Sequence, residues 1–274
     1  MGTSKRERQK QNRTAARAAQ ARAARRSKVR GRTTKWGGLA ILLIVVLFAV
    51  SQFDNSGSGS SDTTVASSDT TGETTTLSTL AGAQITGKTA CPKTDGTQER
   101  ATSFENAPGM CIDAKKSYTA TFDTSQGEIV VDLDTEKTPD TVNNFVVLSR
   151  YKYYDGSYVF RTDPSIDIIQ GGGASNTDDP GYSIKDEGSG FKYKEGDLVM
   201  ARTSAPDSAG GQWFFVAGEK ASLLDSQGTY VTFGRVSSGL DVVKAILALN
   251  SGSGDLGGAP STPVKINTVT ITES

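Results

Sequence analysis

The stretch YVFRTDPSIDIIQGGG, residues 158–173, sets two polar side chains among apolar residues that favour strands. Arg161 follows three large strand-forming residues, and Gln170 ends a second apolar run directly before three glycines. Short runs of β-branched and aromatic residues that end at Gly or Pro are typical of strands. The stretch therefore predicts two neighbouring strands, and it raises the question of what an arginine and a glutamine do there in a chain without histidine.

The residues on both sides of this stretch extend the β pattern. Apolar and polar residues alternate before and after 125–127, which predicts a β-hairpin. A long series of short strands is typical of an antiparallel barrel, and about 160 residues are enough for one hydrophobic core. We expect the further strands around residues 158–160, 166–170, 198–201, 212–217, 231–236 and 264–273.

Two amphipathic helices interrupt the strands. In TPDTVNNFVVLSRY, residues 138–151, Thr138 is a candidate N-cap and Pro139 suits the first helical turn. The segment GLDVVKAILAL, residues 239–249, has the same helical spacing of apolar residues. The apolar stripe of the first helix consists of Val142, Phe145, Val146 and Leu148.

The formal net charge is zero, but the charges are separated along the chain. Residues 1–35 hold 13 Lys or Arg and one acid, whereas the rest of the chain holds 17 Lys or Arg against 29 Asp or Glu. Residues 36–53 carry no charge and, at ~1.5 Å per residue, are long enough to span a membrane as a helix. We expect an uncleaved anchor; a signal peptide is the alternative, although its basic region is normally far shorter.

This arrangement predicts a single-pass protein of the cytoplasmic membrane. The positive-inside rule makes residues 1–35 a basic cytoplasmic tail and places the C-terminal body outside the cytoplasm. The tail lacks interleaved aromatic residues and any nucleic-acid-binding motif, so we expect no nucleic-acid partner. Residues 54–87 are rich in Ser, Thr and Gly with few large apolar groups, which predicts a disordered linker.

The two cysteines, Cys91 and Cys111, fall in a short segment, residues 88–117, that precedes the first expected barrel strand. Outside the cytoplasm disulfides persist, so we expect the two to pair; two unpaired thiols are the alternative. Two cysteines without histidine cannot complete a zinc shell on their own, so we expect no metal site. Because both cysteines precede Tyr118, we expect the barrel to fold without the disulfide.

Seven segments of the body together resemble the cyclophilin family of peptidyl-prolyl cis-trans isomerases, in a membrane-anchored bacterial form. The resemblance covers residues 118–271 with the segments in the family's order. It implies a mainly β fold, an eight-stranded antiparallel closed barrel capped by two α-helices, here preceded by one transmembrane helix. The segments are GEIVVDLDTEKTPDTVNNFVVLSRYKYYDGSYVFR, IIQGGG, GYSIKDEG, GDLVMAR, GGQWFFV, VTFGRV and GLDVVKAI.

The reaction of this family suits a chain without histidine. Rotation about an X–Pro bond is slow because the C–N bond has partial double-bond character, with a barrier of ~20 kcal/mol. No proton moves and no bond breaks, so the reaction needs no cofactor. An apolar trough disfavours the charge-separated planar amide, and a fixed cationic donor stabilises the twisted one. We expect proline-containing polypeptides as partners and a monomeric protein.

The resemblance implies a role for each site residue. Arg161 corresponds to the catalytic arginine, and Gln170 to the glutamine that orients it and contacts the substrate backbone. Gln212 and Phe214 are two apart, so they share one face of their strand. Taken one at a time, these residues could be structural, and only the whole series of motifs favours function. The remaining substrate-binding positions are Ile168, Ala201, Leu224 and Tyr230.

The chain also departs from the family pattern near Arg161. The spacing from Arg161 to Gln170 is one residue longer than usual, and PSIDII replaces the usual aromatic pocket wall. Ile166 or Ile168 would take the place of the aromatic ring, and Asp167 would have to face solvent.

Two hypotheses of function follow from these features. The first is an isomerase that assists the folding of exported proteins outside the cytoplasmic membrane. The alternative is a catalytically weak module that binds or scaffolds proline segments, which the altered wall favours. A further departure is Arg202, which stands where a small polar residue is usual.

Overall fold

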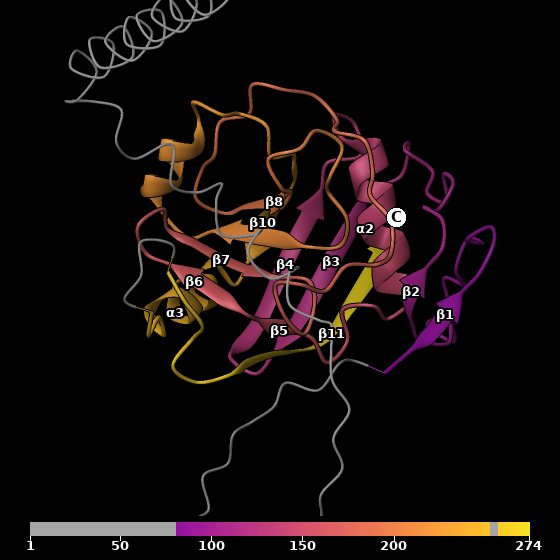
Figure 1. Ribbon diagram of the computed structural model, residues 1–274, viewed down its shortest axis with the longest axis horizontal. Helices are drawn as coiled ribbons and strands as arrows, with labels where there is room; N and C mark the ends of the chain where they lie inside the picture. Colours follow the sequence, from indigo (N-terminus) through magenta and orange to yellow (C-terminus); the bar gives the residue numbers. More distant parts are fainter. Residues whose placement is uncertain (1–80, 253–256) are drawn as a thin grey trace, which may run out of the picture. The chain divides into compact units, whose positions relative to one another are not determined.

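The alternating residues on either side of 125–127 form the predicted hairpin. It consists of β3 (Tyr118–Thr124) and β4 (Gly127–Leu133), paired in register from Tyr118 opposite Leu133 to Thr124 opposite Gly127. Every second side chain of the pair is buried. The protein is represented here by a computed structural model that describes residues 81–252 and 257–274 (Figure 1).

The hairpin lies near the middle of a nine-stranded, nearly closed antiparallel sheet, in the order β5-β11-β3-β4-β10-β8-β9-β7-β6. Eight strands were expected. The fold is mainly β, and the expected strands at 158–160, 166–170, 198–201, 212–217, 231–236 and 264–273 are confirmed with small shifts at their ends. Beyond the hairpin, the strands are β5 (Tyr158–Val159), β6 (Arg161–Asp163), β7 (Ile168–Gly171), β8 (Asp197–Met200), β9 (Trp213–Val216), β10 (Thr232–Ser238) and β11 (Val264–Glu273).

The ninth strand is β6, which follows the expected strand at 158–160 and was not predicted. The expected strand, β5, pairs with β11, while β6 pairs with β7 at the other end of the sheet. Between them the amide of Phe160 donates to the carbonyl of Gln170 at 3.1 Å, so the ladder continues past the break. The segment therefore joins the two edges of the sheet and closes the barrel, with Arg161 directly after the joint.

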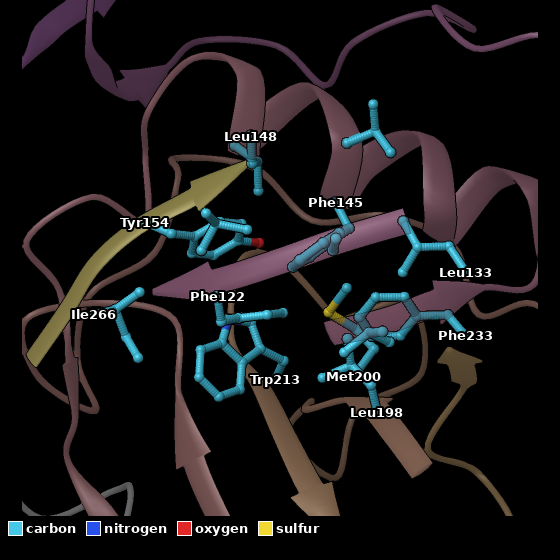
Figure 2. Close-up of a cluster of buried hydrophobic side chains, with 14 of the residues drawn as sticks. Phe122, Leu133, Phe145, Leu148, Tyr154, Leu198, Met200, Trp213, Phe233 and Ile266 are labelled. Carbon is cyan, nitrogen blue, oxygen red and sulfur yellow. The ribbon is translucent and has the colours of Figure 1, made fainter. Parts of the chain in front are cut away.

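Two α-helices accompany the barrel, as expected: α2 (Pro139–Arg150) and α3 (Leu240–Ala248). The predicted apolar stripe of α2 is fully buried and joins the core inside the barrel. Figure 2 shows that core, in which Phe122 lies among Phe145, Tyr154 and Trp213. The ring centroids of Phe122 and Trp213 are 5.3 Å apart in an edge-to-face contact, which adds to the stabilisation from burial alone.

The start of α2 differs from the expectation. Thr138 occupies the N-cap position, but its hydroxyl donates to the carbonyl of Asp134 and makes no cap bond to the helix. Instead the carboxylate of Glu187 accepts from the amides of Asp140 at 3.1 Å and Thr141 at 2.9 Å. A distant acid thus fills the position that the local sequence assigned to Thr138, and its charge suits the positive end of the helix dipole.

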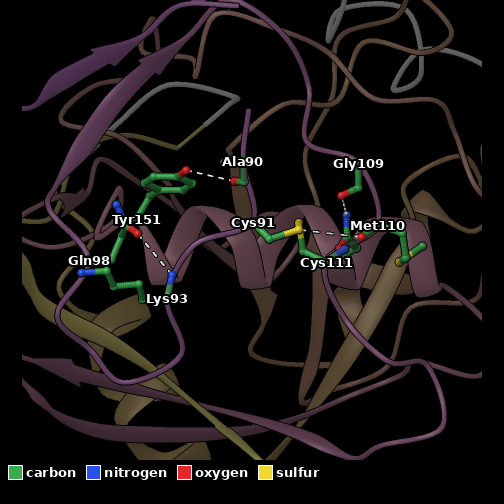
Figure 3. The surroundings of a disulfide bond; sticks show 9 residues. Ala90, Cys91, Lys93, Gln98, Gly109, Met110, Cys111 and Tyr151 are labelled. Atoms are coloured by element: carbon green, nitrogen blue, oxygen red, sulfur yellow. Dashed lines mark hydrogen bonds between the residues drawn. A yellow bond between two sulfur atoms is a disulfide. The ribbon is translucent and has the colours of Figure 1, made fainter. Parts of the chain in front are cut away.

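Cys91 and Cys111 form the predicted disulfide (Figure 3). The amide of Cys111 donates to Oδ1 of buried Asn143 on α2 at 2.7 Å, so the bond is anchored to the first helix. The hydroxyl of Tyr151, at the end of the same helix, donates to the carbonyl of Ala90 at 2.9 Å. The disulfide-bearing segment therefore packs on the barrel domain along α2.

Two of the expected boundaries need correction. Residues 83–85, assigned to the disordered linker 54–87, form β1 (Ala83–Ile85), which pairs in parallel with β2 (Ala101–Phe104). Ala101 and Phe104 are each 1% exposed and belong to the barrel core, so Tyr118 does not begin a separate packing unit. Local composition suggested a linker because the parallel pairing of β1 depends on residues 18 positions away in sequence.

The predicted basic tail, residues 1–35, and the predicted transmembrane span, residues 36–53, lie outside the described residues. So does most of the predicted linker. Within the described part of the chain, no helix has the length and apolar character needed to cross a membrane.

Candidate functional site

Strand register places Arg161, Gln170 and Phe214 in one row across the sheet. Arg161 of β6 lies opposite Gln170 of β7, and Gln170 lies opposite Phe214 of β9. Residues directly opposite each other in a sheet project to the same face. The flanking residues of Phe214, Trp213 and Phe215, belong to the core inside the barrel. This confirms the expected division of faces on β9 and places the row on the outer face of the barrel.

A chain of hydrogen bonds links the polar members of this face. Nη1 of Arg161 donates to Oε1 of Gln170 at 2.9 Å, and Nε2 of Gln170 donates to Oε1 of Gln212 at 3.1 Å. Nε2 of Gln212 donates in turn to the backbone carbonyls of Asn176 and Asp178. The last step ends on fixed main-chain acceptors, so the orientation of each amide, and through it one edge of the guanidinium group, is determined.

Arg161 has a second acceptor that the sequence interpretation did not include. Its Nη2 lies 2.5 Å from Oδ2 of Asp163, two residues further along β6. The Asp163 side chain is 2% exposed, whereas that of Arg161 is 24% exposed. The other carboxylate oxygen of Asp163 accepts from the amide and hydroxyl of Ser165. The alternation of a strand was the signal that Arg161 and Asp163 share a face.

An apolar surface adjoins these polar groups. Eight buried residues form a second hydrophobic cluster, separate from the barrel core, with Ala201 and Tyr230 packed against it. All five of the expected substrate-binding residues that are not glutamines therefore lie in or against one cluster. Its buried members are Ile166, Ile168, Tyr193, Val199, Phe214, Val216, Ala221 and Leu224.

Tyr230 stands between this apolar surface and the charges of the site. Its ring lies 5.7 Å from that of Phe214, centroid to centroid, in an edge-to-face contact. Burial raises the pKa of the Tyr230 phenol, and the positive charges of Arg202 and Arg161 act in the opposite direction. The phenol therefore stays protonated at neutral pH and can donate a hydrogen bond.

Tyr193 positions Tyr230 and was not found from the sequence. Its hydroxyl accepts from the amide of Tyr230 at 2.9 Å and donates to the carbonyl of the same residue at 3.1 Å. Burial raises the pKa of Tyr193 to about 12. The two residues are 37 positions apart, and a single tyrosine between two lysines gives no local signal of such a contact.

The turn between β6 and β7 differs from the expectation for Asp167. This residue adopts a left-handed conformation, with φ of 50°, which accommodates the additional residue of the turn. Its carboxylate accepts from the amide of Lys220 at 3.0 Å and pairs with Nζ of Lys220 at 3.1 Å. Asp167 is therefore tied to the 3-10 helix η2 (Glu219–Leu224) rather than directed to solvent. Ile166 and Ile168 on either side both enter the apolar cluster.

Arg202 is paired with an acid outside the apolar cluster. Its Nη1 forms an ion pair with Asp186 and also donates to the carbonyl of Ala205 at 3.2 Å. The side chain is 9% exposed. The positive charge at this unusual position is therefore largely covered and compensated by Asp186.

Gly172 explains part of the triple glycine that follows Gln170. Its φ is +105°, and a Cβ atom there would lie 2.5 Å from the carbonyl oxygen of Gly211. Glycine alone therefore lets the end of β7 approach the segment that carries Gln212. This close approach brings Gln170 within bonding distance of Gln212.

The arrangement can place a fixed, permanently charged donor beside an apolar surface. A charged donor beside an apolar surface suits a reaction in which one substrate atom becomes a better hydrogen-bond acceptor in the transition state and no proton is transferred. Within residues 81–252 and 257–274, no group of three or more His, Cys, Asp or Glu is placed to hold a metal ion.

Comparison with known proteins agrees with this geometry. A family model described as cyclophilin type peptidyl-prolyl cis-trans isomerase/CLD matches residues 119–271, more than half of the chain. Peptidyl-prolyl cis-trans isomerase B of Escherichia coli is 35% identical over 168 residues, which cover 56% of this chain and 99% of the relative. Peptidyl-prolyl cis-trans isomerase cyp18 of Streptomyces antibioticus is 34% identical over 144 residues, which cover 49% of this chain and 86% of the relative.

A solved structure is similar to the fold. The cyclophilin type peptidyl-prolyl cis-trans isomerase of Cryptosporidium parvum superimposes with a TM-score of 0.51 at 23% sequence identity. The match covers 58% of this chain and 99% of that chain.

Proposed function

The chain belongs to the cyclophilin family of peptidyl-prolyl cis-trans isomerases, and we propose that it isomerises X–Pro bonds of exported polypeptides outside the cytoplasmic membrane. It is an isomerase. The proposal adds the site residues, the location and the class of substrate. The observation that carries it is the chain of hydrogen bonds from Arg161 through Gln170 to Gln212, beside Phe214.

Catalysis follows from the two parts of the site. The apolar cluster around Phe214 receives the proline ring and removes water that favours the planar, charge-separated amide. The guanidinium group of Arg161 donates to the amide nitrogen, which becomes a better acceptor when the bond is twisted. Gln170 and Gln212 fix the donor before substrate binds, so little reorganisation is needed in the transition state.

The geometry of the turn argues for an enzyme rather than a weak binding module. The altered wall favours the weak binding module, because a carboxylate at Asp167 is unfavourable beside an apolar pocket. Asp167 instead pairs with Lys220, while Ile166 and Ile168 supply apolar surface. Aliphatic side chains, Ile166 and Ile168, therefore take the place of the usual aromatic residue in the pocket wall.

The proposed location rests on sequence features together with the disulfide. The basic residues 1–35 precede the uncharged residues 36–53, which orients the body outward. The Cys91–Cys111 bond fits an oxidising compartment. Tethering there would present the site to unfolded polypeptides as they leave the membrane. We expect a monomer that acts on them one at a time.

Paired fusions test the location. Alkaline phosphatase, which is active only outside the cytoplasm, is fused after Ser274 in one chimera and after Lys35 in the other. We expect activity from the first fusion and none from the second. An inactive first fusion that is expressed and stable would contradict the proposed location, and turnover of X–Pro peptides by the purified protein would still test the enzyme separately.

A further inference from the structure

Asp163 is a buried carboxylate next to the candidate site. It ends β6 with its side chain 2% exposed, on the same outer face as Arg161. Buried acids are rare unless they are paired, and the partner here is Nη2 of Arg161 at 2.5 Å. We propose that Asp163 is a positioning residue for the isomerase reaction, which fixes the guanidinium group of Arg161. This inference rests on the proposed function of Arg161.

Gln170 and Asp163 accept from Arg161 on different strands and hold different nitrogens. Gln170 on β7 holds Nη1 at 2.9 Å, and Asp163 on β6 holds Nη2. One acceptor alone would let the planar group turn about that single bond. Two acceptors on separate nitrogens fix both the direction and the plane of the fork.

A second function of Asp163 has to be distinguished from this one. Its Oδ1 accepts from the amide of Ser165 at 3.0 Å and from the hydroxyl at 2.6 Å, so it also shapes the turn after β6. The two functions use different oxygens, because Oδ2 contacts Arg161. Asp163→Asn can keep the Oδ1 bonds to Ser165. Its amide nitrogen then faces Nη2 of Arg161, donor against donor, and the guanidinium group must move.

The same turn provides a matched control. Asp167 is also a partly buried carboxylate, but it pairs with Lys220 instead of Arg161. Asn tolerates the left-handed conformation of this position. Asp167→Asn therefore removes one negative charge from the same turn and leaves Gln170 and Asp163 in place as acceptors of Arg161.

The test measures kcat and KM for an X–Pro tetrapeptide with full-length protein in detergent, using protease-coupled cleavage of the trans isomer. Misplacing a catalytic group costs rate, so we expect Asp163→Asn to lower kcat roughly 10-fold with little change in KM. Asp167→Asn should remain within about two-fold of the parent, a change too small for lost positioning. In an Arg161→Ala background, Asp163→Asn should cause no further loss.

Parent-like kcat of Asp163→Asn would overturn the inference while leaving the function of Arg161 intact. An equal loss from Asp163→Asn in the Arg161→Ala background would also overturn it, because the effect would then come from the turn. Should Asp163→Asn not fold, Asp163→Glu keeps the charge but displaces the carboxylate by one methylene. It should lose kcat as well, and parent-like kcat would count against positioning. Parent-like activity of Arg161→Ala would instead remove the proposed function.

Discussion

At Arg161 the sequence places a charge where the fold supplies fixed partners for it. Gln170 and Asp163 hold the guanidinium group from two strands, and Phe214 begins the apolar surface beside it. The charged part and the apolar part of the site should therefore respond differently to substitution. Loss of the guanidinium group should affect the transition state, whereas loss of the aromatic ring should affect binding.

Phe214→Ala tests the apolar part. Phe214 is 3% exposed, so its removal leaves a cavity and should lower the free energy of unfolding by about 3 kcal/mol. The KM for an X–Pro peptide should rise because the surface for the proline ring is lost. Phe214→Leu, which refills most of the volume, should recover most of the stability. An unchanged KM in Phe214→Ala protein that is still folded would place the substrate elsewhere.

Among the elements, α2 shows how distant residues complete a helix. At the first turn of α2, the Glu187 carboxylate accepts hydrogen bonds from two backbone amides and from the hydroxyl of Thr141. Glu187 and Asp186 are neighbours, and Asp186 holds Arg202. The segment that supplies the cap therefore also restrains Arg202, whose positive charge acts on the Tyr230 phenol.

Removal of the cap should destabilise the protein. Glu187→Ala leaves the first amides of α2 without their acceptor, and loss of an N-cap acceptor costs ~1 kcal/mol. Chemical denaturation of the variant and the parent measures the difference. Glu136→Ala, which removes an exposed acid just before the helix, is the control and should be nearly neutral. Equal stability of Glu187→Ala and the parent would mean that solvent replaces the cap without cost.

Local pattern predicted the elements better than their partners. The alternation in β3 and β4 and the stripe from Val142 to Leu148 predicted these elements correctly, because each depends on neighbours in sequence. The same reasoning assigned the cap of α2 to Thr138 and Asp167 to solvent. Thr138 does occupy the N-cap position, but the first amides of α2 donate to Glu187, and Asp167 pairs with Lys220. Local pattern could not show these partners, because they lie 46 to 53 residues away.

The candidate site shows the same division. The family resemblance named residues that the structure places on one face, as the register of Arg161, Gln170 and Phe214 shows. Asp163 and Tyr193 were missed. Asp163 matters through its bond with Arg161, and Tyr193 through its two bonds with the backbone of Tyr230. Strand alternation could indicate only that Asp163 shares a face with Arg161, and the contact of Tyr193 has no local signal at all.

For the whole molecule, the segment before Tyr118 and the last strand both bind to α2. The disulfide loop contributes Ala101 and Phe104 to the barrel core. Glu273, at the end of β11, forms ion pairs with Arg150 at the end of α2 and with Lys116. Contacts at the two ends of the domain thus converge on one helix.

The disulfide should contribute to the stability of the whole domain, and the expectation that the barrel folds without it stays a prediction. Closing a loop of 20 residues in the unfolded chain is worth about 3 kcal/mol in the chain-entropy model. The packing of Phe104 transmits this restraint to the core. A Cys91→Ser, Cys111→Ser variant should melt at lower temperature than the oxidised parent and should not respond to reductant. Equal Tm values would show that the segment holds without the bond.

Glu273 should make stability depend on pH. Its hydrogen bond from Arg150 lowers the pKa of the carboxyl group in the folded protein. The contribution of this carboxyl group to stability is therefore fully present above its pKa in the unfolded chain, and it is lost as pH falls through its pKa in the folded protein. As a partly exposed pair it is worth at most about 1 kcal/mol. Glu273→Gln should lower Tm at neutral pH and match the parent in acid. A difference that grows with acidification would have the wrong sign.

The most direct test of the proposed mechanism is the rate of X–Pro isomerisation by the Arg161→Ala variant. If the guanidinium group stabilises the twisted amide, kcat/KM should fall by roughly 10²-fold, or about 2.7 kcal/mol. Arg161→Ala leaves the buried carboxylate of Asp163 without this ion-pair partner, so Tm should fall, and the rates are compared below the Tm of the variant. Arg161→Lys should not restore the rate because an ammonium group cannot reproduce the fork. Isomerisation by folded Arg161→Ala protein as fast as by the parent would contradict the assignment of Arg161 as the catalytic group.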